Sequence, residues 1–136
     1  MEWFTCDADA GAAMLSGCRV LVIEDEPIIA EDLRDALTAA EAIVVGPLAS
    51  VGEARRMLKG GTAVDAALLD LNLSDGEVTP VLEALRARRV PVVIYTGGSL
   101  PERVLQRHPD LVALSKPMMS ARLIGELRRA WKQPAA

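Results

Sequence analysis

Aromatic residues are scarce in this chain: Phe, Trp and Tyr make up 3% of its 136 residues. A hydrophobic content of 51% nevertheless argues against a chain that stays unfolded for want of apolar surface. The core must therefore be aliphatic, built from Leu, Val, Ile and Ala. At this length we expect one domain with a substantial core.

Cysteine and histidine are scarce as well. Cys6 and Cys18 are the only cysteines, which is too few for a disulfide framework or a thiol metal site. We expect a reduced pair in a cytoplasmic protein. The single histidine, His108, precedes Pro109 and has no other ligand type clustered with it. We expect it to be a surface residue without a catalytic role.

An excess of positive charge and long apolar runs are also missing. The net charge of −4 provides no basic surface for nucleic acid and no Lys/Arg-rich face for a membrane. No run approaches the roughly 18 apolar residues of a membrane-spanning helix. Residues 1–17 contain acidic residues but no Lys or Arg, which argues against a signal peptide. We interpret them as an N-terminal extension, residues 18–132 as the domain, and residues 133–136 as a tail.

What the chain does have is a regular alternation of short apolar runs and longer amphipathic segments. Five apolar runs predict strands at 19–23, 42–46, 66–71, 90–96 and 111–115. The segments that follow them predict helices at 27–41, 50–61, 78–89, 100–108 and 120–133. Strands this apolar are covered on both faces. We therefore expect an α/β fold, (βα)5, with a doubly wound parallel sheet of five strands in the flavodoxin-like order 2-1-3-4-5.

Polar residues stand at the ends of four of these strands. Glu24 and Asp25 follow the first strand, Asp70 lies at the end of the third, Thr96 ends the fourth, and Lys116 follows the fifth. The carboxyl ends of parallel strands meet at one edge of the sheet, where ligands of such folds bind. We therefore expect three carboxylates, one hydroxyl and one ammonium to meet in a single site.

The chemistry of this set indicates a magnesium-assisted reaction of phosphate. Clustered carboxylates are ligands for a hard cation, and Mg²⁺ suits oxygen ligands that leave positions for water. The ammonium of Lys116 can pair with a carboxylate or with a phosphoryl oxygen. A carboxylate nucleophile can form an aspartyl-phosphate. Asp25 alone could be a helix-end charge and Asp70 a turn residue, but neither interpretation explains why these groups converge.

The polar residues at the strand ends, and their order within residues 18–132, resemble those of the receiver domains of two-component response regulators. The resemblance implies that Asp70 is the phosphoacceptor. It also implies that Asp25 binds Mg²⁺ directly, that Glu24 acts mostly through water, and that the main-chain carbonyl of Asn72 completes the metal ligands.

The resemblance also concerns the groups that receive the phosphoryl group. It implies that Lys116 contacts a phosphoryl oxygen, that Thr96 moves to bond it, and that the Lys116–Pro117 peptide bond is cis. One feature differs: receivers often carry an aromatic residue three positions before the lysine, and Ala113 stands there. Tyr95 precedes Thr96, but neighbouring strand residues face opposite sides, so we do not expect it to be a simple substitute.

The segment VIYTGG, residues 93–98, resembles the FATG-type fourth strand of an alphaproteobacterial receiver subfamily. That subfamily lacks the switch aromatic, tends to a loose fourth helix and is linked to histidine kinases of the HWE type. We therefore expect a stand-alone, single-domain response regulator. It takes its phosphoryl group from a histidine kinase or a histidine-phosphotransfer protein and acts on a downstream protein, as a switch, a relay shuttle or a phosphate sink.

Two other functions stay open at this point. A receiver fold can bind partners without phosphorylation, which the missing aromatic favours and the complete acidic set opposes. A hydrolase of the haloacid dehalogenase type also uses an aspartyl-phosphate, but Asn72 stands where such phosphatases place a second Asp. We therefore expect no turnover of other substrates, only catalysis of the chain's own phosphorylation and dephosphorylation.

Overall fold

The computed structural model describes residues 14–132. Residues 1–13 of the predicted extension, with Cys6, and the predicted tail 133–136 lie outside the described residues. Leu15 is fully buried, and its N–H donates a hydrogen bond to the carbonyl of Ala40. Part of the predicted extension therefore packs on the domain, while the boundary at residue 18 stays a prediction. Among the described residues, no helix has both the length and the apolar character needed to cross a membrane.

A five-stranded sheet in the order β2-β1-β3-β6-β7, with every pairing parallel, forms the centre of the molecule. Its strands are β1 (Arg19–Ile23), β2 (Ile43–Leu48), β3 (Ala66–Asp70), β6 (Val92–Thr96) and β7 (Val112–Ser115). The helices are α2 (Pro27–Ala39), α3 (Val51–Lys59), α4 (Thr79–Ala87), α5 (Glu102–Arg107) and α6 (Ser120–Lys132). A small antiparallel hairpin, β4 (Asn72–Leu73) and β5 (Gly76–Glu77), stands between the predicted strand 66–71 and the predicted helix 78–89. Because β6 and β7 are the fourth and fifth strands of the sheet, the predicted (βα)5 fold and its order 2-1-3-4-5 are confirmed.

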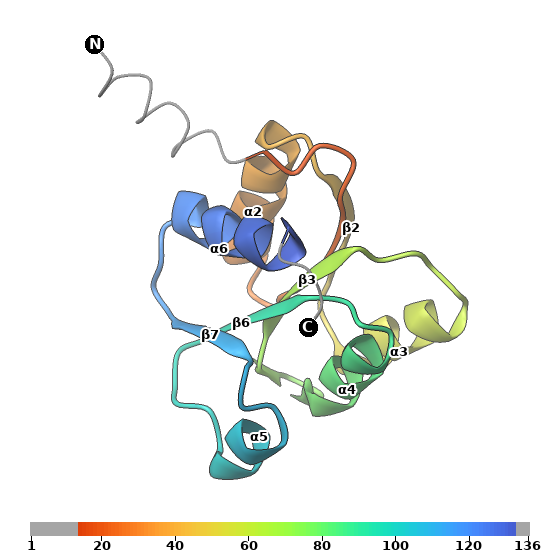
Figure 1. Cartoon of the computed structure of the whole chain (residues 1–136), viewed down its shortest axis with the longest axis vertical. Coiled ribbons are helices and arrows are strands. Elements are labelled where there is room, and N and C mark those ends of the chain that lie inside the picture. Colours follow the sequence, from red (N-terminus) through yellow and green to blue (C-terminus); the bar gives the residue numbers. More distant parts are fainter. Residues whose placement is uncertain (1–13, 133–136) are drawn as a thin grey trace.

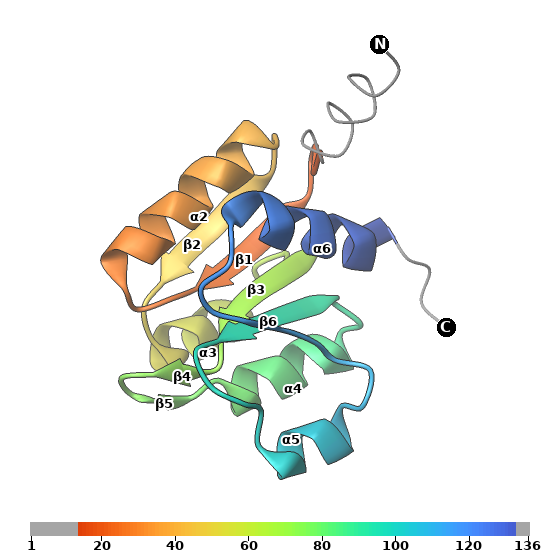
Figure 2. The same cartoon turned by 90° about the vertical axis from the view of Figure 1, so that its left-hand side faces the viewer.

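Helices cover both faces of the sheet, as Figure 1 and Figure 2 show. Leu21 and Ile23 of β1 pack in the layer formed with α3, α4 and α5, whereas Val20 and Val22 pack in the layer formed with α2 and α6. This alternation follows from the pleat of a strand. Tyr95 is the only aromatic side chain among the buried hydrophobic residues described, so the core is aliphatic as predicted.

Local sequence signals determine where two of the helices begin. Ser50 and Glu53 have the spacing of a capping box, and the Ser50 hydroxyl accepts a hydrogen bond from the N–H of Glu53 at 3.1 Å. Pro27 is the first residue of α2, a position that suits it because the N–H it lacks would have no helical partner. Both helix starts agree with the sequence pattern.

We expect Ser50→Ala to lower the free energy of unfolding by about 1 kcal/mol, because it removes the acceptor for an N–H at the start of α3. Urea denaturation followed by circular dichroism measures the change. Ser99→Ala, at an exposed position in the loop after β6, is the matched control and is expected to change stability little. A loss no larger than that of the control would contradict the capping role.

The second strand runs further than predicted. The sequence predicts a strand over 42–46, whereas β2 continues past Pro47 to Leu48 through an irregularity in its register with β1. Gly46 permits this path, because its φ is 105° and a side chain there would meet the Leu48 nitrogen at 2.8 Å. The carbonyl of Leu48 then accepts a hydrogen bond from the N–H of Glu24 at 2.9 Å. The longer strand therefore holds the backbone of a candidate site residue.

His108 is buried, and the prediction that it lies at the surface is wrong. The residue is 9% exposed, and its backbone N–H donates to the carbonyl of Val104 in α5. Val104 packs in the layer of α3 and α4, so this six-residue helix brings its last turn against the domain. No residue near this short helix specifies whether its last turn packs against the domain or faces solvent.

Candidate functional site

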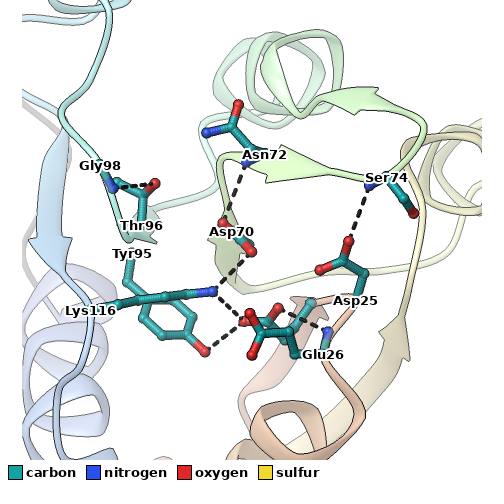
Figure 3. A network of polar contacts seen from close by, with 10 residues as sticks. Asp25, Glu26, Asp70, Asn72, Ser74, Tyr95, Thr96, Gly98 and Lys116 are labelled. Atoms are coloured by element: carbon teal, nitrogen blue, oxygen red, sulfur yellow. Dashed lines mark hydrogen bonds and ion pairs between the residues drawn. The ribbon is translucent and has the colours of Figure 1, made fainter.

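Four strands bring the expected site residues to one edge of the sheet. Glu24 follows β1, Asp70 is the last residue of β3, Thr96 is the last residue of β6, and Lys116 follows β7 directly. In the parallel register, Asp70 lies beside Tyr95 of β6. Figure 3 shows Lys116 pointing toward Asp70, with the ring of Tyr95 alongside. The strand topology therefore assembles the site from segments far apart in the sequence.

Three carboxylates form the acidic part of the site. Ligand atoms of Glu24, Asp25 and Asp70 all lie within 4.8 Å of one another. The side chain of Glu24 is fully buried and that of Asp70 is 8% exposed. Oxygen atoms at this spacing suit a hard divalent cation such as Mg²⁺, which favours carboxylates and water. The three side chains fit the predicted metal site.

The β4–β5 hairpin holds one side of this acidic group. The N–H of Ser74 donates a hydrogen bond to Oδ2 of Asp25 at 3.1 Å. The N–H of Asn72 donates to Oδ1 of Asp70 at 3.4 Å, a long and weak bond. These contacts direct the loop after β3 toward the carboxylates. The part expected of the Asn72 carbonyl as a metal ligand stays a prediction.

The ammonium of Lys116 balances two of the three carboxylates. Its Nζ lies 3.0 Å from Oδ2 of Asp70 and 3.0 Å from Oε1 of Glu24. The backbone N–H of Lys116 donates to the carbonyl of Thr96 at 2.8 Å, which ties the end of β7 to the end of β6. The Lys116–Pro117 peptide bond is cis, so the expectation from the resemblance is confirmed.

The two carboxylates that share this ammonium differ in their electrostatics. Burial opposes the charged form of Glu24, but hydrogen bonds from the Glu26 N–H, the Tyr95 hydroxyl and Lys116 outweigh it and lower its pKa. Burial raises the pKa of Asp70, and repulsion from Glu24 adds to this, because Lys116 compensates only in part. Burial also opposes the charged form of Lys116, but its bonds to Asp70 and Glu24 raise its pKa. The site therefore favours the charged form of Glu24 and opposes that of Asp70.

Thr96 lies at the edge of the site without joining its ion pairs. It is 4% exposed, and its hydroxyl accepts a hydrogen bond from the N–H of Gly98 at 3.4 Å. In the part of the chain that the structure describes, this hydroxyl makes no hydrogen bond to Asp70 or Lys116. Figure 3 shows it directed toward Gly98. The predicted contact with a phosphoryl oxygen requires the threonine to move and stays a prediction.

Tyr95 is the site residue that sequence reasoning missed. Its hydroxyl donates a buried hydrogen bond to Oε1 of Glu24 at 2.8 Å, and the ammonium of Lys116 lies 4.9 Å from its ring centroid. Alternation along β6 does place Tyr95 and Thr96 on opposite faces of the sheet. Tyr95, however, pairs with Asp70, so both side chains lie on the same face. Aligning the polar ends of the two predicted strands would have paired Asp70 with Thr96, whereas the register of β3 and β6 pairs it with Tyr95.

The position usually taken by an aromatic residue has no bulky side chain. Ala113 is exposed and pairs with Ile94 in the register of β7 and β6. Tyr95 does not replace the missing ring, because it lies in the layer of α2 and α6 and reaches Glu24. The absence of a ring at position 113 and the bond from Tyr95 to Glu24 are therefore separate features.

Comparisons with known proteins agree with this geometry. Residues 20–128 match the family model of the response regulator receiver domain. The chain is 30% identical over 115 residues to the phyllosphere-induced regulator PhyR of Methylorubrum extorquens, a match that covers 82% of this chain but only 42% of PhyR. The solution structure of SdrG from Sphingomonas melonis Fr1 is 35% identical, with a TM-score of 0.71, and the match covers 87% of this chain and 98% of SdrG.

A third relative carries the metal that the acidic group suits. The receiver domain of the sensor histidine kinase PA1611 from Pseudomonas aeruginosa PAO1 was solved with a magnesium ion coordinated in its active-site cleft. It is 25% identical, with a TM-score of 0.72, and the match covers 87% of this chain and all of that domain. With most of its length matched by one family model and its polar groups at the ends of the expected strands, the chain belongs to the family of response regulator receiver domains.

Proposed function

We propose that this chain accepts a phosphoryl group on Asp70 and passes on a signal as a response regulator. One observation carries the proposal. The ammonium of Lys116 lies 3.0 Å from both Asp70 and Glu24, beside a group of three carboxylates whose ligand atoms lie within 4.8 Å of one another. A carboxylate nucleophile, an ammonium and a set of carboxylates that suits a divalent cation are what transfer of a phosphoryl group to Asp requires.

The reaction exchanges one bond to phosphorus for another. A carboxylate oxygen of Asp70 attacks the phosphorus of a phosphohistidine, and the P–N bond breaks as the P–O bond forms. The histidine nitrogen keeps the electron pair of the broken bond. The ammonium of Lys116 turns from the Asp70 carboxylate to one oxygen of the transferred group. The hydroxyl of Thr96 leaves the N–H of Gly98 and bonds another oxygen of that group.

The carboxylates of this site would hold Mg²⁺, whose charge would offset that of the transferring group. Asp25, Asp70 and the carbonyl of Asn72 are the proposed ligands, with Glu24 acting through water. The spacing of the carboxylates supports this assignment. Ser74 supports it as well, because its N–H holds Asp25 toward Asp70 on the side opposite Lys116.

The proposed phosphodonor is a histidine kinase, for example one of the HWE type, or a histidine-phosphotransfer protein in the cytoplasm. Similarity to SdrG and to the regulator PhyR supports a signalling role. The surface of α5, β7 and α6 is the proposed contact face for a downstream protein. Leu105 of α5 is 43% exposed there, and Met119, in the loop between β7 and α6, is 78% exposed, which suits an apolar contact. The chain would act there as a switch, a shuttle or a sink.

A receiver that binds partners without phosphorylation is the second candidate, and Ala113 is the observation that favours it. Without the aromatic residue, the usual coupling between Thr96 and a moving ring cannot operate. The two candidates differ in the use of the acidic group. Binding of Mg²⁺, measured by the perturbation of amide NMR signals, is expected only if the site serves phosphotransfer.

The proposed function is tested by incubating the protein with acetyl phosphate. We expect one phosphoryl group per chain in the presence of Mg²⁺ and none when EDTA replaces the ion, measured by intact mass and on Phos-tag gels. The same sample is expected to leave a chromogenic phosphate ester intact, since the chain catalyses only its own phosphorylation and dephosphorylation. Absence of the adduct in Mg²⁺ would reject the proposal, and steady hydrolysis of the ester would favour a phosphatase.

A further inference from the structure

Tyr95 stands at the centre of the site without belonging to the groups expected to touch metal or phosphate. It is the only tyrosine in the chain, it is 3% exposed, and it pairs with Asp70 in the register of β3 and β6. Its ring packs in the layer of α2 and α6. Its hydroxyl nevertheless donates to Oε1 of Glu24 at 2.8 Å. A packing role alone does not require that bond.

Glu24 depends on three donors. The N–H of Glu26 lies 3.1 Å from Oε2, while the Tyr95 hydroxyl at 2.8 Å and the Lys116 ammonium at 3.0 Å share Oε1. The side chain of Glu24 is fully buried, so bulk solvent does not replace a donor that leaves Oε1. A buried carboxylate that loses a partner carries the full cost of its desolvation.

Lys116 serves two acceptors, and phosphorylation adds a third. In the unphosphorylated chain its ammonium bonds Asp70 and Glu24 together. When it turns to a phosphoryl oxygen on Asp70, it weakens or leaves Oε1 of Glu24. Of the two donors on that oxygen, only the hydroxyl of Tyr95 then remains. The ring lies 4.9 Å from the ammonium and keeps the lysine side chain alongside as it turns.

We infer that Tyr95 is a positioning residue that holds Glu24 when Lys116 turns to the phosphoryl group, and so stabilises the phosphorylated form of the receiver. The inference rests on the proposed function. It assigns the tyrosine a task distinct from that of the aromatic residue missing at position 113, because Tyr95 acts on a carboxylate inside the site. Ala113, by contrast, lies exposed on β7.

Tyr95→Phe isolates the hydroxyl, because it keeps the ring, its packing and its position over Lys116. We expect the variant to bind beryllofluoride, a phosphoryl mimic, about ten-fold more weakly in Mg²⁺, which is the size of one hydrogen bond to a charged group. Titrations followed by amide NMR signals give the dissociation constants. In the Glu24→Ala background, the same change is expected to alter binding by less than about two-fold, because the acceptor is gone.

The wild-type protein supplies a second measurement that needs no variant. Labelling tyrosine with ¹³C gives the ring signals of Tyr95 alone, since the chain has one tyrosine. We expect these signals to shift when beryllofluoride is added to the Mg²⁺-saturated protein, because Lys116 changes its position over the ring. A shift shows that Lys116 moves relative to the ring, as the inference requires.

The outcomes separate the inference from the function on which it rests. If the wild type fails to bind beryllofluoride, the proposed function fails and the inference fails with it. If the wild type binds but Tyr95→Phe binds equally well, or loses the same factor when Glu24 is Ala, the inference is overturned while phosphotransfer to Asp70 stands. Ring signals of Tyr95 that ignore beryllofluoride also overturn it.

Discussion

Asp70→Asn is expected to abolish the phosphoryl adduct that the wild type forms with acetyl phosphate and Mg²⁺. The substitution removes the proposed attacking carboxylate, one of the three clustered carboxylates, while changing the volume of the side chain little. The protein is expected to stay folded, because Lys116 keeps its bond to Glu24. Intact mass and Phos-tag gels measure the adduct, and circular dichroism checks the fold.

Asp75→Asn is the matched control, since it makes the same chemical change five residues away. The carboxylate of Asp75 accepts hydrogen bonds from the N–H groups of Val51 and Gly52 at 2.9 and 3.1 Å and lies outside the acidic group. We expect this variant to form the adduct. An adduct retained in Asp70→Asn would mean that another side chain is the acceptor, and the assignment of Asp70 would be wrong.

The fold was predictable because its signals are local. Each strand of the sheet is a short apolar run, and Asp70 and Thr96 mark the ends of β3 and β6 where the sequence changes from apolar to polar. The continuation of β2 through Gly46 and Pro47 was not predictable, because it depends on pairing with β1. The burial of His108 depends likewise on how α5 packs, which no nearby residue specifies.

The candidate site was predictable in its composition but not in its connections. Glu24, Asp70 and Lys116 could be placed at one edge, since the ends of parallel strands meet there. The bond from Tyr95 to Glu24 could not be derived from alternation along one strand. It depends on the register that pairs Tyr95 with Asp70, and on the reach of the tyrosine side chain to Glu24. Contacts across strands need that register, which the sequence of a single strand does not contain.

Lys116→Met is expected to lower the free energy of unfolding by about 3 kcal/mol at neutral pH without Mg²⁺, the size expected when one partner of a buried ion pair is removed. The methionine keeps the apolar length of the lysine but leaves Glu24 and Asp70 without their shared ammonium. Burial then disfavours both charges, and the two carboxylates repel one another. Urea denaturation in EDTA measures the loss, and Lys59→Met, at an exposed position of α3, is the matched control.

The pH dependence of this loss identifies its cause. In the wild type, the lowered pKa of Glu24 contributes stability above the value of about 4.3 of an unfolded glutamate, and this contribution is lost as the pH falls. The raised pKa of Lys116 contributes stability below the value of about 10.4 of an unfolded lysine, and this contribution is lost as the pH rises beyond it.

Without the lysine, the pKa values of Glu24 and Asp70 both rise. As the pH falls, these carboxylates therefore lose their unfavourable charges at a higher pH in the variant than in the wild type. Its deficit relative to the wild type is expected to shrink from neutral pH toward about pH 5, and Mg²⁺ is expected to reduce it at neutral pH by replacing the missing positive charge. A deficit that is equal at both pH values and unaffected by Mg²⁺ would mean that lost packing of the lysine stem, rather than two uncompensated carboxylates, destabilises the variant.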